Sequence, residues 1–111
     1  MDLREEVTGE VTILEVRGRL DSTTAPVLGD KLTGALATPQ RRLVLDLHQL
    51  EYISSAGFRV LLLAFKRAED AGSRFVLCRV SGKVRQLFDL GGFLDLFPIS
   101  ASREDGLAAV R

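Results

Sequence analysis

The chain has 111 residues, the usual length of one domain, and shows no linker or internal repeat, so we expect a single domain over residues 1–111. Lys and Arg number 15 in total, as do Asp and Glu, and this balance gives no electrostatic basis for binding nucleic acid or an anionic membrane. An acidic N-terminus without a signal peptide, and apolar runs far shorter than the roughly 20 residues that span a bilayer, predict a cytoplasmic protein with no direct membrane insertion.

The start of the sequence predicts a β-hairpin. MDLREEV (1–7) and EVTILEVRG (10–18) carry strand-forming residues on either side of Gly9, and the tolerance of glycine for positive φ suits a tight turn at that point. Gly18 is expected to end the second strand.

A helix is predicted directly after this hairpin, over DSTTAPVLGDKLTGAL (21–36). Thr23 or Thr24 can provide a hydroxyl for its N-cap, and Pro26 fits its first turn, where no backbone donor is needed. The loop that follows the helix is expected at Pro39.

The remaining sequence alternates between apolar strands and amphipathic helices. RRLVLDL and RFVLCRV are nearly continuous apolar runs, which is typical of strands that are covered on both faces. The predicted strands are 41–47, 74–80 and 94–100, with HQLEYI (48–53) as a connection. The predicted helices are 54–71, 81–91 and 102–111, with caps at Ser54, Ser81 and Ser102 and stops at Gly72 and Gly91.

Together these elements predict an α/β fold with a single mixed β-sheet. The N-terminal hairpin supplies an antiparallel pair, and the alternation of helix and strand that follows implies crossover connections between parallel strands. We expect about five strands and about four helices.

The sequence holds few of the residues that a catalytic site needs. His48 is the only histidine, and no nucleophile elbow, phosphate-binding loop or dinucleotide-binding turn accompanies it. Cys78 is the only cysteine and is expected in the core. Asp21 and Asp46 are the acidic residues best placed for a site, although their positions also suit ordinary caps or loop acceptors. We therefore expect no enzymatic activity, no metal and no cofactor.

The middle of the chain resembles a known family. LVLDLHQLEYISSAGFRVLL (43–62) resembles the signature of the STAS domain, the fold of anti-sigma factor antagonists, in which a buried strand and a loop lead to Asp-Ser-Ser/Thr-Gly at the start of a helix. The matching positions here are Ser54, Ser55, Ala56 and Gly57. VRGRLDSTTAPVL and FVLCRVSGKVRQLFDLGGFLDLFPI resemble further parts of the family pattern, so the resemblance covers essentially the whole chain.

The resemblance implies a switch protein. Its unphosphorylated form is expected to bind an anti-sigma factor that is also a serine kinase with a histidine-kinase-like ATPase fold, and so to release the sigma factor. Phosphorylation of the serine after the Asp position, which is Ser55 here, would end the interaction, and a PP2C-type phosphatase would reset it. The partner surface is expected to include Asp21, Ser22, Thr23, Ser54, Ser55, Ala56, Gly57 and Arg59.

The residues themselves give physical reasons for such a switch. A serine in the first turn of a helix lies near the surface, where unpaired backbone N–H groups and the helix dipole favour negative charge. Gly57 is expected to leave room for the backbone of a partner. Arg59, four residues after Ser55, is expected on the same face of the helix, where it can pair with a phosphate, contact an acidic partner residue or remain solvated.

Two substitutions keep a second interpretation open. Ser54 stands where the family has Asp, and Ala56 stands where it has a second Ser or Thr. The alternative function is a non-phosphorylated STAS binding module of a scaffold or of a transport-associated complex. From spacing alone, both serines are also explained as ordinary residues at the start of a helix. A third possibility, an enzyme with Ser55 as nucleophile, lacks a candidate base.

Overall fold

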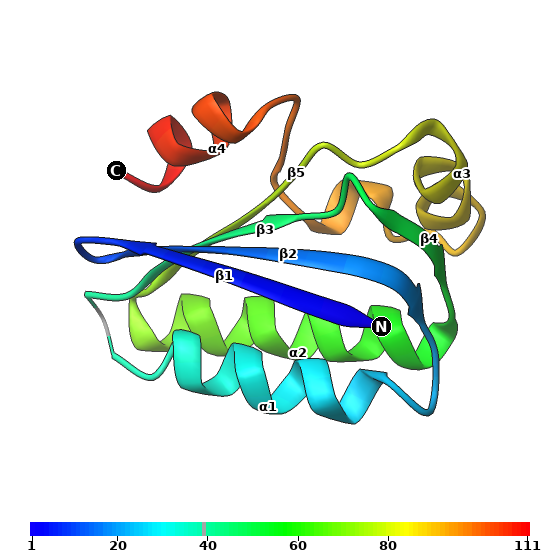
Figure 1. Ribbon diagram of the computed structural model, residues 1–111, viewed down its shortest axis with the longest axis horizontal. Helices are drawn as coiled ribbons and strands as arrows, with labels where there is room; N and C mark the ends of the chain where they lie inside the picture. Colours follow the sequence, from blue (N-terminus) through cyan, green and yellow to red (C-terminus); the bar gives the residue numbers. More distant parts are fainter. Residues whose placement is uncertain (39) are drawn as a thin grey trace.

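The N-terminal hairpin is present in the computed structural model, which describes residues 1–38 and 40–111 (Figure 1). β1 (Asp2–Thr8) and β2 (Val11–Leu20) pair in antiparallel fashion around Gly9, whose φ is +63°. The prediction that Gly18 ends the second strand is wrong. The pairing of β2 shifts in register between Gly18 and Arg19, and the strand continues to Leu20. Such a bulge bends a long strand, so that its two halves meet different neighbours.

Six strands form one mixed sheet in the order β1-β2-β3-β5-β6, and β4 pairs with the far end of β2. The pairs β2–β3, β2–β4, β3–β5 and β5–β6 are all parallel, whereas the hairpin is antiparallel. The mixed sheet and the α/β class are therefore confirmed. The strands after the hairpin are β3 (Arg42–Asp46), β4 (Leu50–Ile53), β5 (Arg74–Cys78) and β6 (Ile99–Ser100).

Two strand predictions are wrong in detail. Residues 50–53, expected to be part of a connection, form β4. The strand predicted over 94–100 is instead a short 3₁₀ turn, η1 (Leu94–Leu96), followed by only two residues of β6. Pro98 has no backbone N–H to donate to a ladder, which favours a short strand that starts after it.

The helices lie in separate layers. α1 (Ala25–Ala35) and α2 (Ser55–Ala71) run side by side under one face of the sheet, and α4 (Arg103–Val110) covers β3 and β5 on the opposite face (Figure 1). α3 (Gly82–Leu90) lies at the end of the sheet beside β4. The predicted caps Ser54, Ser81 and Ser102 are confirmed, because each accepts a hydrogen bond from the backbone N–H three residues further on.

The central strands are buried on both faces, as predicted. Leu43, Leu45 and Leu77 belong to the main core between the sheet and the α1–α2 layer. Val44 and Cys78 belong to a second, smaller core that α4 closes on the other face. The middle residues of β3 and β5 are therefore apolar on both faces, and solvent is reached only at the arginine that begins each strand.

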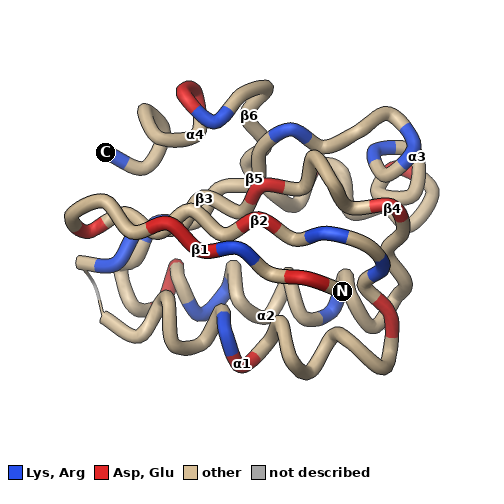
Figure 2. Tube along the Cα trace, in the orientation of Figure 1, with Lys and Arg blue, Asp and Glu red and all other residues tan. Residues whose placement is uncertain are grey.

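Charges of both signs are interspersed over the surface, for example along β1 and α1 (Figure 2). None of the helices in the described part of the chain has both the length and the apolar character that a bilayer span requires. The loop predicted at Pro39 lies outside the described residues.

Candidate functional site

The pairing of β2 with β4 brings two of the predicted site segments together. Leu20, the last residue of β2, pairs with Ile53, the last residue of β4, and the N–H of Ser54 donates to the carbonyl of Leu20 over 2.9 Å. Asp21 and Ser54 therefore follow neighbouring parallel strands at the same edge of the sheet. This edge, beyond the carboxyl ends of parallel strands, is where α/β proteins commonly bind ligands.

The carboxylate of Asp21 shapes its own turn. Its Oδ1 accepts hydrogen bonds from the N–H groups of Thr23 and Thr24, at 3.0 and 3.2 Å, and these bonds lower the pKa of Asp21. Thr24 is the N-cap residue of α1, but its hydroxyl donates to the carbonyl of Arg19 instead of capping the helix. The turn is thus held rigidly from within, and Ser22 and Thr23 are exposed at its tip.

The two serines at the start of α2 have different environments. Ser54 is extended, with ψ 174°, and its Oγ accepts a hydrogen bond of 3.4 Å from the N–H of Gly57. Ser55 is the first residue of α2 and is exposed, and its hydroxyl makes no hydrogen bond within the described part of the chain. Ser54 is therefore a structural cap, whereas the hydroxyl of Ser55 is free to react or to contact a partner.

Gly57 has a different role from the one predicted. It is buried, and a Cβ at this position would lie 2.8 Å from Cγ1 of Ile53 and 2.8 Å from Cγ of Leu20. The absent side chain therefore lets α2 approach β2 and β4 within the protein, rather than leaving room for the backbone of a partner. Ala56 is half-buried against the main core.

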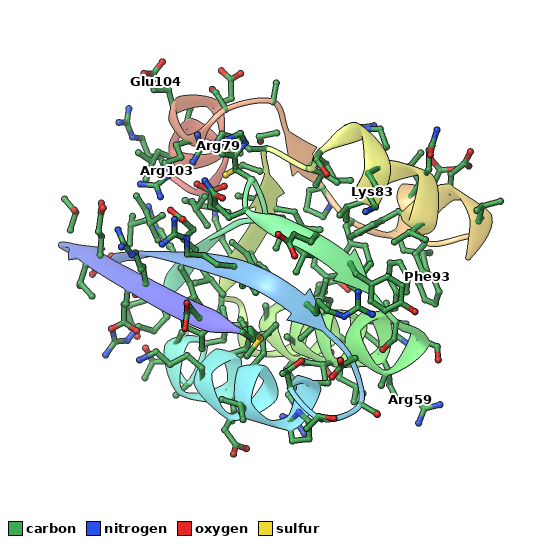
Figure 3. All side chains as sticks on the ribbon, turned by 45° about the vertical axis from the view of Figure 1, so that its right-hand side comes forward. Arg59, Arg79, Lys83, Phe93, Arg103 and Glu104 are labelled. Atoms are coloured by element: carbon green, nitrogen blue, oxygen red, sulfur yellow. The ribbon has the colours of Figure 1, made fainter. Side chains whose placement is uncertain are left out.

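Aromatic stacking anchors the start of α2. The ring of Phe58 stacks on that of Phe93 with centroids 4.4 Å apart, and meets that of Phe88 edge-on at 4.8 Å. Phe93, labelled in Figure 3, was not predicted as part of this region, because Gly91, two residues before it, was interpreted only as a helix stop. The sequence signal that could have indicated a packing role for Phe93 is an aromatic residue directly after two glycines.

Two arginines flank the site without a carboxylate partner within the described residues. Arg59 projects from the first turns of α2 into solvent (Figure 3). The guanidinium of Arg19 lies 4.3 Å from the ring centroid of Tyr52, a cation–π arrangement that was not predicted from the sequence.

Comparison with known proteins supports the family suggested by the sequence. The sequence model of the STAS domain family matches residues 3–106 of this chain. The chain belongs to the STAS domain family. It is 41% identical over 96 residues to BtrV of Bordetella bronchiseptica, a candidate anti-sigma factor antagonist. The aligned region covers 86% of this chain and 83% of BtrV. It is 33% identical over 94 residues to the anti-sigma-B factor antagonist of Bacillus subtilis, covering 85% of each.

A solved structure agrees with this assignment. The crystal structure of an anti-sigma factor antagonist from Mycobacterium paratuberculosis matches this chain with a TM-score of 0.84 at 27% identity. The match covers 99% of this chain and 93% of that one. The STAS fold predicted from the sequence is confirmed.

Asp46, the second acidic residue singled out from the sequence, is the centre of a buried ion-pair network in this STAS domain. Its side chain is fully buried and accepts hydrogen bonds from the guanidinium groups of Arg79, at 2.5 to 3.2 Å, and of Arg103, at 2.6 Å. The backbone N–H of His48 donates to it as well, over 3.0 Å. Burial alone would raise the pKa of Asp46, but these hydrogen bonds outweigh it and lower the pKa.

The same network fastens α4 to the sheet. Arg103, at the first position of α4, also pairs with Glu15 of β2 at 2.9 Å and with Glu6 of β1 at 3.6 Å. Arg79 and Arg103 lie beside each other under the start of α4 (Figure 3). Asp46 therefore has a structural role, and it does not contribute to the surface around Ser55.

Cys78 is buried next to Asp46, in the small core under α4. Burial, with the Asp46 carboxylate as a second cause, raises the pKa of the Cys78 thiol to about 11. Because the thiolate is the reactive form, we expect the native protein to react with an aromatic disulfide reagent at least about 100-fold more slowly than the denatured protein at pH 7. Absorbance of the released thiol measures both rates, and similar rates would contradict the burial of Cys78.

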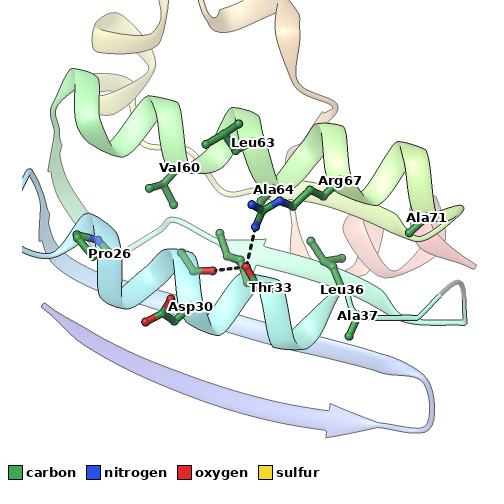
Figure 4. Close-up of a pocket in the computed structure, with 12 residues that line it drawn as sticks. Pro26, Asp30, Thr33, Leu36, Ala37, Val60, Leu63, Ala64, Arg67 and Ala71 are labelled. Atoms are coloured by element: carbon green, nitrogen blue, oxygen red, sulfur yellow. Dashed lines mark hydrogen bonds between the residues drawn. The ribbon is translucent and has the colours of Figure 1, made fainter.

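The described residues contain no group of three or more His, Cys, Asp or Glu side chains that could hold a metal ion. A groove of about 550 Å³ runs between α1 and α2, and Arg67 donates to Thr33 across it over 3.0 Å (Figure 4). None of the predicted site residues lines this groove. The candidate site is therefore the surface formed by the Asp21 turn and the start of α2.

Proposed function

We propose that this protein is an anti-sigma factor antagonist whose interaction with an anti-sigma factor is switched by phosphorylation of Ser55. Two curated relatives named as antagonists of this kind, one of them marked as a candidate, support the role. The observation that carries the site is the exposure of Ser55 at the first position of α2, with a free hydroxyl beside the Asp21 turn.

In this proposal the protein is a ligand and a substrate, not an enzyme, and it acts in the cytoplasm. The unphosphorylated surface around Ser55, Asp21, Ser22 and Thr23 binds the anti-sigma factor, a serine kinase with a histidine-kinase-like ATPase fold, and so frees the sigma factor. The kinase then modifies Ser55 with ATP and Mg²⁺, and a PP2C-type phosphatase removes the phosphate.

The position of Ser55 suits a switch that changes binding without unfolding the domain. A phosphate carries a charge of about −1.5 to −2 at neutral pH. At the N-terminus of α2, the helix dipole favours such a charge by about 0.3–1 kcal/mol at an exposed site. The folded state therefore tolerates the modification, whereas a partner packed against a neutral hydroxyl meets new bulk and charge.

We expect incubation with ATP, Mg²⁺ and the kinase-like regulator encoded beside this gene to add one phosphate to the wild type and none to Ser55→Ala, as measured by intact mass. Thr8→Ala, which removes an exposed hydroxyl at the turn end of the β1–β2 hairpin, away from the proposed binding surface, is the matched control and is expected to be modified like the wild type. A phosphate that persists in Ser55→Ala would refute the site.

A binding measurement tests the switch itself. Ser55→Asp is expected to bind the regulator at least about tenfold more weakly than the wild type, a loss of about 1.4 kcal/mol, with an unchanged thermal unfolding midpoint. If the wild type binds the regulator but is never modified, and Ser55→Asp binds as tightly, the non-phosphorylated STAS binding module becomes the better description.

A further inference from the structure

Arg59 shares a helix face with Ser55. α2 is a continuous helix from Ser55 to Ala71, so residues four apart have Cβ atoms about 5–6 Å from each other on one face. Arg59 is exposed and extends into solvent near the start of the helix (Figure 3). Its guanidinium is thus within reach of a group attached to the Ser55 hydroxyl.

Most other arginines near the sheet already have partners. Arg17, Arg79 and Arg103 pair with carboxylates. Arg19 lies over the Tyr52 ring, and Arg67 donates to Thr33. Arg59 has neither a carboxylate nor a hydrogen-bond acceptor among the described residues. It is therefore free to pair with a new anion.

The elements packed against the start of α2 do not supply a competing cluster of one charge. They carry both signs, with Arg19 on β2 and Asp21 just after it, Asp30 and Lys31 on α1, Glu51 on β4, and Lys83, Arg85 and Asp89 on α3. The Asp21 carboxylate is bound to the N–H groups of its own turn. Helix geometry therefore makes Arg59 the cation placed to respond to a charge on Ser55.

We infer that Arg59 receives the phosphate of phosphorylated Ser55 in an intramolecular ion pair. This inference rests on the proposed function, because it concerns the phosphorylated form. The planar guanidinium matches phosphate oxygens in a bidentate geometry. In the unphosphorylated protein Arg59 remains available to an acidic residue of the partner. Phosphorylation then both adds charge at Ser55 and withdraws a cation from the binding surface.

The test is a ³¹P NMR titration of protein carrying phosphoserine installed at position 55 during translation, without any kinase. An adjacent guanidinium stabilises the dianion, so the second pKa of the phosphate is expected to be roughly half a unit lower in the wild type than in Arg59→Gln. The difference is expected to shrink in 1 M salt, which screens charges beyond about 3 Å.

Lys66→Gln is the matched control. It removes the same charge from the same helix, but Lys66 lies eleven residues beyond Ser55, about 16 Å along the axis. The phosphate pKa in Lys66→Gln is expected to equal that of the wild type. Equal pKa values in the wild type and Arg59→Gln, or an equal rise in both variants, would overturn the inference.

Failure of this inference is distinguishable from failure of the proposed function. The phosphoserine is incorporated during translation rather than added by the regulator, so the titration gives its answer even if the regulator never modifies Ser55. Conversely, a phosphate whose pKa is the same in the wild type and in Arg59→Gln leaves the mass and binding experiments on Ser55 unaffected.

Discussion

Replacing Asp46 with asparagine is expected to lower the free energy of unfolding by about 3 kcal/mol. The amide retains the volume of the side chain and can still accept from the His48 N–H, but it leaves the guanidinium groups of Arg79 and Arg103 without their buried counter-charge. Removing one partner of a buried ion pair typically costs about 3–5 kcal/mol. The side chains of Arg79 and Arg103 are 33% and 29% exposed, so water partly solvates the guanidinium charges left unpaired. The lower end of this energy range is therefore expected.

Thermal and urea unfolding measure this effect, with an expected fall of roughly 10–15 °C in the unfolding midpoint. Asp30→Asn, on the exposed side of α1 and without an ion pair in the described part of the chain, is the matched control and should change stability by less than about 0.5 kcal/mol. An Asp46→Asn protein as stable as the wild type would show that the network contributes only specificity.

The pH dependence follows from the lowered pKa of Asp46. The folded state holds this carboxylate ionised below the pKa of about 3.9 that it has in the unfolded chain. Its contribution to stability is therefore complete above that value and is lost as the pH falls through the folded pKa. The difference between wild type and Asp46→Asn should be constant from pH 6 to 8 and shrink below about pH 4. A difference that grows on acidification would contradict this account.

Local sequence signals predicted most of the fold because they act over a few residues. The capping serines and the apolar spacing of α2 specify a helix that starts after Ser54 and stops at Gly72. β4 escaped prediction because LEYI has only four residues and no clear alternation. Its state is decided by pairing with the end of β2, which depends on the bulge at Gly18 and thus on contacts far away in the sequence.

The site was predicted in part for the same reason. Spacing placed both serines at the start of a helix and indicated Ser54 as its cap, whereas the resemblance to the STAS signature singled out Ser55, whose phosphorylation stays a prediction. The function of Asp46 depended on Arg79 and Arg103, which are 33 and 57 residues away, and no local pattern indicates such a pairing. The interpretation of Gly57 failed because the sequence does not reveal which face of a helix approaches the sheet most closely.

Gly57→Ala is expected to destabilise the protein by about 1–2 kcal/mol, although alanine is the better helix former. The new Cβ would lie 2.8 Å from Cγ1 of Ile53 and from Cγ of Leu20, closer than carbon atoms can pack. Both atoms are bonded directly to the Cβ of their own residue, and both side chains are buried in the core. A change of rotamer therefore cannot move them out of the way. Overpacking costs about 1–3 kcal/mol, and helix propensity returns at most about 1 kcal/mol.

Gly34→Ala is the matched control for this change, and it should have the opposite sign. Gly34 is also helical, but a Cβ there meets no atom within 4 Å, so only the propensity term of about 0.5–1 kcal/mol in favour of alanine remains. Urea unfolding separates the two variants. Because Gly57 lets α2 lie against β2 and β4, its replacement should also displace Ser55 from the Asp21 turn and weaken regulator binding, whereas Gly34→Ala should leave binding unchanged. A stabilised Gly57→Ala protein would mean that the start of α2 can move away from the sheet without cost.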